Sequence, residues 1–412
     1  MRRVVITGVG AVSPVGNDAD STWSSIRDSV CGIAPITLFD TEDFPIRYAA
    51  EVKDYVPSEH FRPLDLKKLS RAAQFGIIAS QEAFSDSGLE GSGYDSSRFS
   101  VFFGSGAGGG IPAEEYAALS EKGADGISKL MIPRGLINMI AANVAIRLGA
   151  HGSCLPVVTA CSTGTDCIGM AYRDILHGYS DISAAGGAEA GISSIGLAGF
   201  NAIGALAKGG DPGRLSIPFD LERTGFVMGE GAGCLILEEM EHARKRNAHI
   251  YAEITGYGSS CDAYNLTAPD PSMKHGSRAM LAALAEAGAA PEDISYINAH
   301  GTGTKLNDSY ETAMIKNVFG EYSRSIPVSS TKSMTGHLLG ASGAVETVII
   351  CKAMENGIVP PTAGYSVSDP LCDLDYVTDG ARQAEIRYAM NNSLGFGGHN
   401  AVLILKNTDL KG

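Results

Sequence analysis

The sequence is poor in positive charge and contains no long apolar run. Its 412 residues include 32 Lys and Arg against 46 Asp and Glu, which gives a formal net charge of −14. A general nucleic-acid-binding surface needs an excess of basic residues, so this class of function is excluded. No run reaches the about 18 apolar residues of a membrane span, and the apolar run near Met1 is too short for a signal peptide. We therefore expect a soluble, cytoplasmic protein.

The cysteines do not occur in metal-binding or redox spacings. None of the eight belongs to a Cys-x-x-Cys pair, and none has zinc-ligand spacing with a histidine. We therefore expect no metal site, and we interpret every cysteine except Cys161 as a buried, reduced thiol. The eight are Cys31, Cys154, Cys161, Cys167, Cys234, Cys261, Cys351 and Cys372.

Two glycine-rich segments resemble nucleotide-binding motifs but lack their defining residues. In Gly8-Val-Gly-Ala-Val-Ser13, a serine stands where the third glycine of a dinucleotide fingerprint belongs, and Pro14 follows it. The glycine run over residues 104–110 is not followed by Gly-Lys-Ser/Thr, so it is not a phosphate loop. Neither segment predicts a nucleotide cofactor.

Short β-branched runs alternate with helical patterns along the whole chain. This alternation predicts an α/β protein with largely parallel, buried sheets. Strands are expected at residues 4–7, 100–103, 155–159, 181–185, 233–238 and 295–298, and helices at 67–88 and 240–246.

The chain also contains a weak internal repeat. Tyr251-Ala-Glu-Ile-Thr-Gly-Tyr-Gly echoes Arg3-Val-Val-Ile-Thr-Gly-Val-Gly. In addition, one predicted strand leads to His300 much as another leads to Cys161. We infer an internally duplicated chain. Its halves are residues 1–250 and 251–412.

Cys161 lies in the small-residue motif Thr-Ala-Cys-Ser-Thr-Gly-Thr, between a predicted strand and a predicted helix. Ile168, Tyr172 and Ile175 recur at helical spacing, and Gly178 is placed to end that helix. The thiol is therefore expected on the turn at the helix N-terminus, where peptide dipoles and free N–H groups favour negative charge. We predict that Cys161 loses its proton readily there and acts as a nucleophile.

Two histidines occupy equally dense small-residue motifs. His300 lies in Asn-Ala-His-Gly-Thr-Gly-Thr, and His337 lies in Ser-Met-Thr-Gly-His-Leu-Leu-Gly. Neither has the His-Glu-x-x-His spacing of a zinc site. Thr302 and Thr304 supply small hydroxyls at alternating positions, suited to hydrogen-bonding an amide-rich arm. One thiol and two imidazoles are a sufficient set for acyl transfer followed by carbon–carbon bond formation.

These three motifs resemble those of the β-ketoacyl-acyl carrier protein synthases of the elongating, synthase II-like type. The resemblance covers essentially the whole chain and implies the thiolase-like fold, in which two duplicated α/β halves form a layered α-β-α-β-α core. It also implies decarboxylative Claisen condensation in fatty acid elongation. Cys161 would carry the acyl group, and His300 and His337 would stabilise the enolate formed from malonyl-acyl carrier protein. The substrates would arrive on the phosphopantetheine of acyl carrier protein, with no metal, flavin or nicotinamide.

The same resemblance implies roles for residues around the nucleophile. Lys332 and Glu346 would form a buried ion pair near the site. Phe396, in Gly-Phe-Gly-Gly, would gate the acyl channel. Its backbone N–H would join that of Cys161 as an oxyanion hole.

The expected pocket and the carrier-protein dock depart from the pattern of that family. Phe200 and Ala107 would contact the acyl substrate, and Ala107 stands where a branched residue is frequent at the pocket floor. The glycine run 104–110 that contains Ala107 would line this pocket or a subunit contact. Gly204 replaces a frequent arginine of the dock. The remaining basic stretch of the dock would be Lys67, Lys68 and Arg71.

Relatives with the same fold are distinguished by their catalytic sets. A thiolase needs a second catalytic cysteine, but Cys372 lies in Pro-Leu-Cys-Asp-Leu rather than in Cys-x-Gly. An initiating synthase has a Cys-His-Asn triad, whereas this chain has His337. A ketosynthase subunit of a type II polyketide or polyene pathway shares all three residues and stays open as the alternative. The expected assembly is a homodimer joined through residues 154–159, or a heterodimer with a chain-length-factor homologue.

Overall fold

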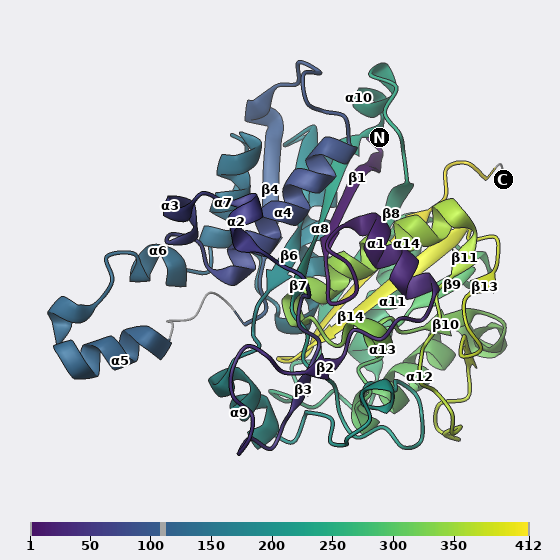
Figure 1. Cartoon of the computed structure of the whole chain (residues 1–412). Coiled ribbons are helices and arrows are strands. Elements are labelled where there is room, and N and C mark those ends of the chain that lie inside the picture. Colours follow the sequence, from purple (N-terminus) through teal and green to yellow (C-terminus); the bar gives the residue numbers. More distant parts are fainter. Residues whose placement is uncertain (1, 108–112, 411–412) are drawn as a thin grey trace.

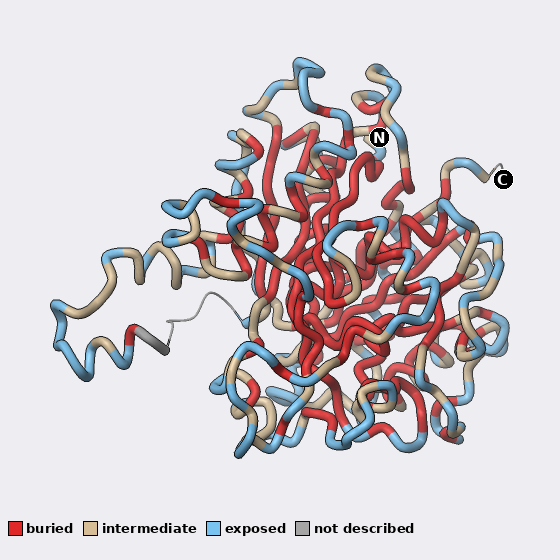
Figure 2. The backbone as a smooth tube through the Cα atoms, in the orientation of Figure 1, coloured by how far each residue is buried: buried red, intermediate tan, exposed pale blue. Residues whose placement is uncertain are grey.

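The computed structural model describes residues 2–107 and 113–410. Within these residues, the centre of the fold is one mixed sheet of eleven strands (Figure 1). Figure 2 shows the buried backbone concentrated in the middle of the fold. In spatial order the strands are β12 (Asp375–Tyr376), β10 (Pro327–Ser329), β9 (Tyr296–Asn298), β14 (Tyr388–Gly395), β15 (His399–Lys406), β8 (Ala252–Cys261), β1 (Val4–Val12), β7 (Gly231–Glu239), β6 (Ile182–Glu189), β4 (Phe99–Gly104) and β5 (Cys154–Leu155).

The two halves of the sheet repeat one strand order. From the centre outward, the first half runs β1-β7-β6-β4-β5, and the second runs β8-β15-β14-β9-β10 with β12 added at its edge. Each strand of the first half thus has a counterpart at the same position in both chain order and spatial order. The halves join where β1 and β8 pair antiparallel, with Val4 opposite Ile254. This repeat favours the proposed division into residues 1–250 and 251–412.

Helices form three layers around the two half-sheets. The middle layer is α8 (Thr163–Leu176) and α14 (Ser342–Asn356), which contact strands of both halves. On the outer side of the first half, α4 (Arg71–Asp86) packs on β1, β7 and β6, and α7 (Met139–Leu148) packs on β4. On the second half, α11 (Lys274–Ala287) packs on β8 and β15, with α12 (Lys305–Phe319) beside it. The expected α-β-α-β-α layering is therefore present.

Glycines in the first strand of each half let a helix pack directly on the strand backbone. A Cβ at Gly10 would lie 2.1 Å from the Ala79 carbonyl oxygen of α4, and a Cβ at Gly258 would lie 1.9 Å from the Ala279 carbonyl oxygen of α11. No larger residue fits at such distances. The repeated Thr-Gly-x-Gly segments therefore serve helix packing, which explains why the first of them only imitates a dinucleotide fingerprint.

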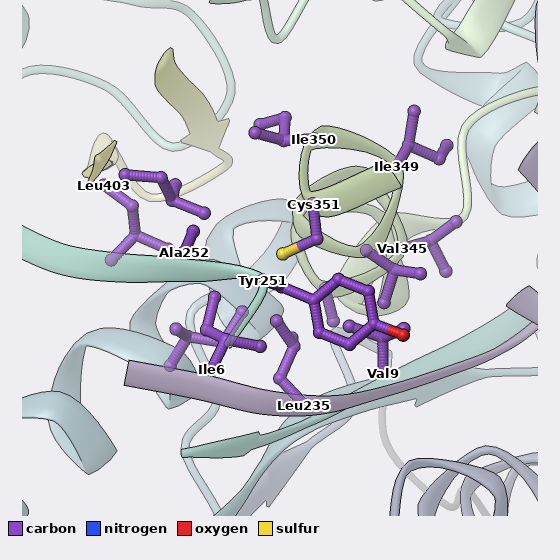
Figure 3. Packing of buried hydrophobic residues seen from close by; sticks show 14 of the residues in the cluster. Ile6, Val9, Leu235, Tyr251, Ala252, Val345, Ile349, Ile350, Cys351 and Leu403 are labelled. Carbon is purple, nitrogen blue, oxygen red and sulfur yellow. The ribbon is translucent and has the colours of Figure 1, made fainter. Parts of the chain in front are cut away.

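The middle-layer helix α14 carries the centre of the core. Its residues Ser342–Met354 are buried all round, as expected for a helix enclosed by two sheets. Figure 3 shows Val345, Ile349 and Cys351 of this helix close to apolar side chains of the neighbouring strands, in one buried cluster. Cys351 is therefore a structural thiol.

The other cysteines only partly meet the expectation of burial. Cys167, Cys234 and Cys372 are buried and unpaired, as expected. The expectation is wrong for Cys154 and Cys261, which are exposed, and Cys31 is only partly buried. Cys154 lies in the short edge strand β5 and Cys261 ends β8, so neither is covered by a neighbouring layer.

Three further expectations about the elements are wrong. The sheet is mixed rather than largely parallel, because β1, β7, β8 and β15 pair antiparallel at its centre. The strand predicted at 155–159 is only Cys154–Leu155, since Pro156 has no N–H to continue the ladder. The helix predicted at 67–88 begins at Arg71, because the Ser70 side chain caps its N-terminus. The remaining predicted strands and the helix at 240–246 are present with shifted ends.

Shorter helices lie around this framework, and Figure 1 shows α5 and α6 projecting away from the body. No helix in the described part of the chain is long and apolar enough to cross a membrane. The shorter α-helices are α1 (Ala19–Arg27), α2 (Pro57–His60), α3 (Pro63–Leu66), α5 (Ala113–Lys122), α6 (Met131–Gly135), α9 (Ser194–Ala202), α10 (Met240–Lys245) and α13 (Lys332–Thr335).

Candidate active site

Cys161 lies on a strained turn immediately before the middle-layer helix α8. The preceding residue, Ala160, has a φ of +51°, a conformation that a non-glycine residue adopts only where its surroundings hold it. Asp166 of α8 accepts hydrogen bonds from the Thr159 hydroxyl at 2.5 Å and from the Ser162 hydroxyl at 2.9 Å. One buried carboxylate thus fixes both ends of the turn that presents the thiol.

The structure corrects the expected ionisation of Cys161. The thiol is 8% exposed, and its burial raises its pKa to about 12, because a buried thiolate loses its hydration. Lys332 and the backbone N–H groups of Phe396 and Cys161 act in the opposite direction, whereas Glu189 raises the pKa further. Burial therefore outweighs the helix N-terminus, and the free protein holds Cys161 as a thiol.

His300 is held through its backbone by a buried carboxylate. It follows β9, and its N–H and that of Gly301 each donate to Glu311 of α12 at 2.8 Å. Burial raises the pKa of Glu311 to about 7, and these two N–H donors oppose that rise. The Asn392 side chain also donates to Glu311, at 3.2 Å. The turn that carries His300 is therefore fixed by Glu311 of α12, which Asn392 of β14 holds in turn.

His337 has a defined tautomer. The backbone N–H of Leu339 donates to its Nδ1 at 3.3 Å, and the Ser342 hydroxyl lies 3.0 Å from the same nitrogen. Because Nδ1 accepts, the proton of the neutral ring resides on Nε2. The ring centroids of His300 and His337 are 5.3 Å apart, with their planes at 83°. The two imidazole rings thus lie next to each other and almost perpendicular.

Both imidazoles are neutral at physiological pH. Burial lowers the pKa of His300 well below its usual value, and Lys332 and His337 lower it further. Burial and Lys332 lower the pKa of His337 in the same way. A neutral imidazole can donate a hydrogen bond to a developing oxyanion without first giving up a positive charge.

Lys332 and Glu346 form the buried ion pair that was expected. The Lys332 ammonium contacts the Glu346 carboxylate, and the two residues are 1% and 3% exposed. Lys332 belongs to α13 and Glu346 to α14, so the pair links the two segments that flank His337. Neither residue lines the cavity described next.

A cavity of about 400 Å³ opens onto Cys161 and brings together most of the predicted site. Thr302 and Thr304 are hydrogen-bonded to each other in its wall, with their hydroxyl oxygens 3.1 Å apart. The mixture of apolar wall and convergent polar groups is typical of a substrate site. Its predicted members are Cys161, Phe200, His300, Thr302, Thr304, His337 and Phe396.

Aromatic rings narrow the cavity beside the nucleophile. The Phe200 ring lies 6.4 Å from the Phe396 ring and 5.5 Å from the Phe226 ring, between their centroids. Phe226 in turn stands edge-on to His337, at 5.1 Å. Phe396 follows β14 in a turn whose glycines Gly397 and Gly398 have φ values of +86° and +76°. Only glycine adopts such angles without strain, so the turn depends on them.

Two predicted residues are not where the resemblance places them. Ala107 is exposed and does not line the cavity, because its backbone N–H is drawn to Glu189 at 3.2 Å. Within one chain it therefore does not form the pocket floor, and the part of the glycine run at 108–110 lies outside the described residues. Arg71 is not free for a docking partner, because its guanidinium pairs with the buried carboxylate of Glu230 at 2.6 Å. Lys67 and Lys68 are exposed.

Several residues at the site were not predicted from the sequence. Asp166, Glu189 and Glu311 are buried carboxylates that hold the backbone turns, and Phe226 orients His337. Asp166 had the one local signal, since it lies five residues after Cys161 in the segment predicted to be helical. Glu189, Glu311 and Phe226 come from segments whose proximity to the site follows only from the folded chain. Three or more potential metal ligands do not gather anywhere in residues 2–107 or 113–410.

Comparisons with known proteins agree with this site. The model of the β-ketoacyl synthase N-terminal domain matches residues 1–243, and that of the β-ketoacyl synthase C-terminal domain matches residues 251–366. The 3-oxoacyl-[acyl-carrier-protein] synthase 2 of Staphylococcus aureus is 45% identical over 406 residues, covering 98% of each chain.

Solved ketosynthases share the fold. A chain from the complex of a type II PKS acyl-carrier protein with its hexaketide-bound ketosynthase superposes with a TM-score of 0.90 at 34% identity, covering 99% of this chain and 100% of that one. A chain of the ishigamide ketosynthase/chain length factor gives 0.90 at 35% identity, covering 98% and 99%. With a buried cysteine and two neutral histidines in one cavity, this chain belongs to the β-ketoacyl synthase family and is an enzyme of that family.

Proposed function

We propose that this chain is an elongating ketosynthase of fatty acid synthesis, which condenses an acyl group held on Cys161 with malonyl-acyl carrier protein. The observation that carries this proposal is that one thiol and two neutral, adjacent imidazoles line a single cavity. The similarity to 3-oxoacyl-[acyl-carrier-protein] synthase 2 over nearly the whole chain supports the elongating type.

Acyl transfer comes first in the proposed sequence. The Cys161 sulfur attacks the thioester carbonyl of an acyl-carrier protein, and the thiol proton leaves with the released pantetheine thiol. The developing oxyanion is met by the backbone N–H groups of Cys161 and Phe396, which already point at the sulfur. Because the acyl-enzyme must form before the second substrate reacts, ping-pong kinetics are expected.

Decarboxylation of the malonyl group uses the histidines. The bond to the carboxylate breaks, carbon dioxide leaves, and the electron pair moves onto the thioester oxygen as an enolate. The Nε2–H of His337 and the His300 ring donate to that oxygen. Neutral donors suit this step, because they stabilise the enolate without protonating it.

Condensation then follows in the same cavity. The enolate carbon attacks the acyl carbonyl on Cys161, the tetrahedral intermediate collapses, and the Cys161 thiolate leaves and takes up a proton. Thr302 and Thr304 would hold the amides of the pantetheine arm, and Phe200 and Phe396 would contact the acyl chain. The released product is a β-ketoacyl-carrier protein.

The proposal implies a carrier-protein partner and no bound cofactor. Both substrates would be thioesters of phosphopantetheine on acyl carrier protein, in the cytoplasm, and the reaction would use no metal, flavin or nicotinamide. Lys67 and Lys68 are the exposed members of the predicted basic dock. A homodimer is the proposed assembly.

A second candidate is a ketosynthase subunit of a type II polyketide or polyene pathway. The observation that favours it is the TM-score of 0.90 with ketosynthases of such systems, one of which is paired with a chain length factor. In that case the chain would act as a heterodimer with a cysteine-less homologue and would extend its product repeatedly.

The test of the proposed function is intact-mass trapping on Cys161 with a panel of acyl-carrier proteins. We expect saturated acyl groups on the wild-type protein, none on Cys161→Ala, and one round of condensation after malonyl-carrier protein is added. Cys161→Gln should keep malonyl decarboxylation, because both histidines remain. Wild-type condensation by Cys161→Ala would overturn the mechanism, and accumulation of poly-β-ketone chains would favour the second candidate.

A further inference from the structure

Glu189, the last residue of β6, has a buried carboxylate that binds four neutral donors. The side chain is 1% exposed. Its Oε1 accepts from the Ser105 hydroxyl at 2.7 Å. Its Oε2 accepts from the backbone N–H groups of Gly106 at 2.8 Å, Gly340 at 3.1 Å and Ala107 at 3.2 Å. The carboxylate thus joins the segment after β4 to the turn that precedes α14.

The segments that Glu189 joins are packed against the nucleophile turn. A Cβ on Gly106 would lie 2.7 Å from the Ala160 carbonyl oxygen and 2.9 Å from the Gly340 nitrogen. Three backbone segments therefore touch at this point, and Ala160 is the residue with positive φ next to Cys161. A change in the hydrogen bonds of Glu189 would therefore shift the Cys161 turn through backbone contacts alone.

The charge of Glu189 also acts on the thiol, whose pKa it raises. Burial raises the pKa of Glu189, while its four hydrogen bonds favour the carboxylate. The ionised form opposes Lys332 at the Cys161 sulfur. The charged side chains that shift the pKa of the thiol are Lys332 of α13 and Glu189 of β6. The cavity that opens onto the thiol also holds the titratable side chains of His300, His337, His399, Asp262, Lys305 and Tyr310.

We propose that Glu189 is a positioning residue for acyl transfer: its carboxylate fixes the Ser105–Ala107 segment and Gly340 against the Cys161 turn, and its charge adds to the burial that keeps the unacylated cysteine as a thiol. The part that concerns acyl transfer rests on the proposed function. Glu189 does not line the cavity and acts on the substrate only through Cys161. Lys332 and Glu189 thus shift the pKa of the Cys161 thiol in opposite directions, because Lys332 lowers it and Glu189 raises it.

Two variants separate the effect of the hydrogen bonds of Glu189 from the effect of its charge. Glu189→Gln removes the charge, whereas Glu189→Asp keeps the charge but is too short to reach all four donors. The matched control is Glu82→Gln, because Glu82 of α4 is a partly buried carboxylate that is also bound by backbone N–H groups, those of Ala11 at 2.9 Å and Ala19 at 2.7 Å. Glu82 lies outside the cavity lining.

The first measurement is the pH dependence of Cys161 alkylation by iodoacetamide, without any carrier protein. Peptide mass spectrometry is needed, because the exposed Cys154 and Cys261 also react. We expect the profile of Glu189→Gln to move to lower pH by roughly one unit, as removal of a nearby charge does. Glu189→Asp and Glu82→Gln should keep the wild-type profile. A wild-type profile for a folded Glu189→Gln would overturn the electrostatic part.

The second measurement is acyl transfer to Cys161 from an acyl-carrier protein. We expect Glu189→Asp to lower kcat by about 10- to 100-fold at unchanged KM, which is the effect of a misplaced reacting group. A wild-type kcat in Glu189→Asp would overturn the positioning part of the proposal. If Glu189→Gln fails to fold, this kcat measurement alone decides the proposal. No acylation of the wild-type protein by any carrier would refute the proposed function, whereas the alkylation result would stand.

Discussion

Lys332 and Glu346 form an ion pair that is closed off from solvent beside the two histidines. The positive charge of Lys332 lowers the pKa of both His300 and His337, and it also lowers that of the Cys161 thiol. Glu346 balances this charge, so a cation can remain buried next to neutral imidazoles. The pair therefore affects both the stability of the fold and the electrostatics of the site.

Removing one partner of this pair should destabilise the protein strongly. Lys332→Met leaves the Glu346 carboxylate buried and unpaired, which costs about 3–5 kcal/mol, whereas replacing both residues by apolar ones should recover most of that loss. Urea unfolding measures both values. The control is Lys316→Met, which breaks the exposed pair with Asp373 and should cost less than about 1 kcal/mol. Equal losses in the two single variants would show that the buried pair has no special role.

The histidines should divide the reaction into separable steps. We expect His300→Ala and His337→Ala to block malonyl decarboxylation by about 100-fold or more while acyl transfer to Cys161 is affected less. The reason is that backbone N–H groups serve the first oxyanion, whereas the enolate depends on the imidazoles. Acyl-enzyme formation by intact mass and carbon dioxide release are followed separately. Equal loss of both steps in each variant would contradict this division.

Decarboxylation should not weaken at mildly acidic pH. Both histidines have a pKa lowered well below the ordinary value of 6.5, so the neutral ring persists at pH values where an exposed histidine is protonated. In Cys161→Gln, which isolates this step, the rate should stay flat through pH 6.5 and fall only well below it. Lys332→Met removes one cause of the lowered pKa, so its decline should begin at higher pH. A rate that halves near pH 6.5 in Cys161→Gln would contradict the neutral assignment.

The set of Cys161, His300 and His337, which line one cavity, could be predicted because each lies in a local motif. The helix after Cys161 and the pairing of Lys332 with Glu346 were also predicted correctly. The ionisation of the thiol could not be predicted, because local sequence shows the helix N-terminus but not the burial that outweighs it. Glu189 was missed for a related reason: its partners at 105–107 and Gly340 meet it only when the half-sheets close on the middle helices.

The position of Ala107 shows the limit of reasoning from a motif. A glycine-rich segment after a strand can bend in many directions, and here Glu189 draws its backbone away from the cavity. The mixed sheet was missed because buried antiparallel strands at the junction of two halves have the same continuous apolar pattern as parallel ones. The strand order that repeats in both halves could not be derived from two similar octapeptides.

The edge strand β5 should be the contact of a homodimer. It ends the large sheet, and its Leu155 is 49% exposed, with Val158 shortly after it at 43%. An exposed edge with apolar side chains is normally covered by a partner, and two-fold pairing is the commonest solution. We therefore expect Leu155→Arg to convert a dimer to a monomer by light scattering at micromolar concentration. The control Leu371→Arg, at a 68% exposed leucine just before the opposite edge strand, should remain dimeric. A monomeric wild-type protein that dimerises only with a cysteine-less homologue would refute the homodimer and support the polyketide alternative.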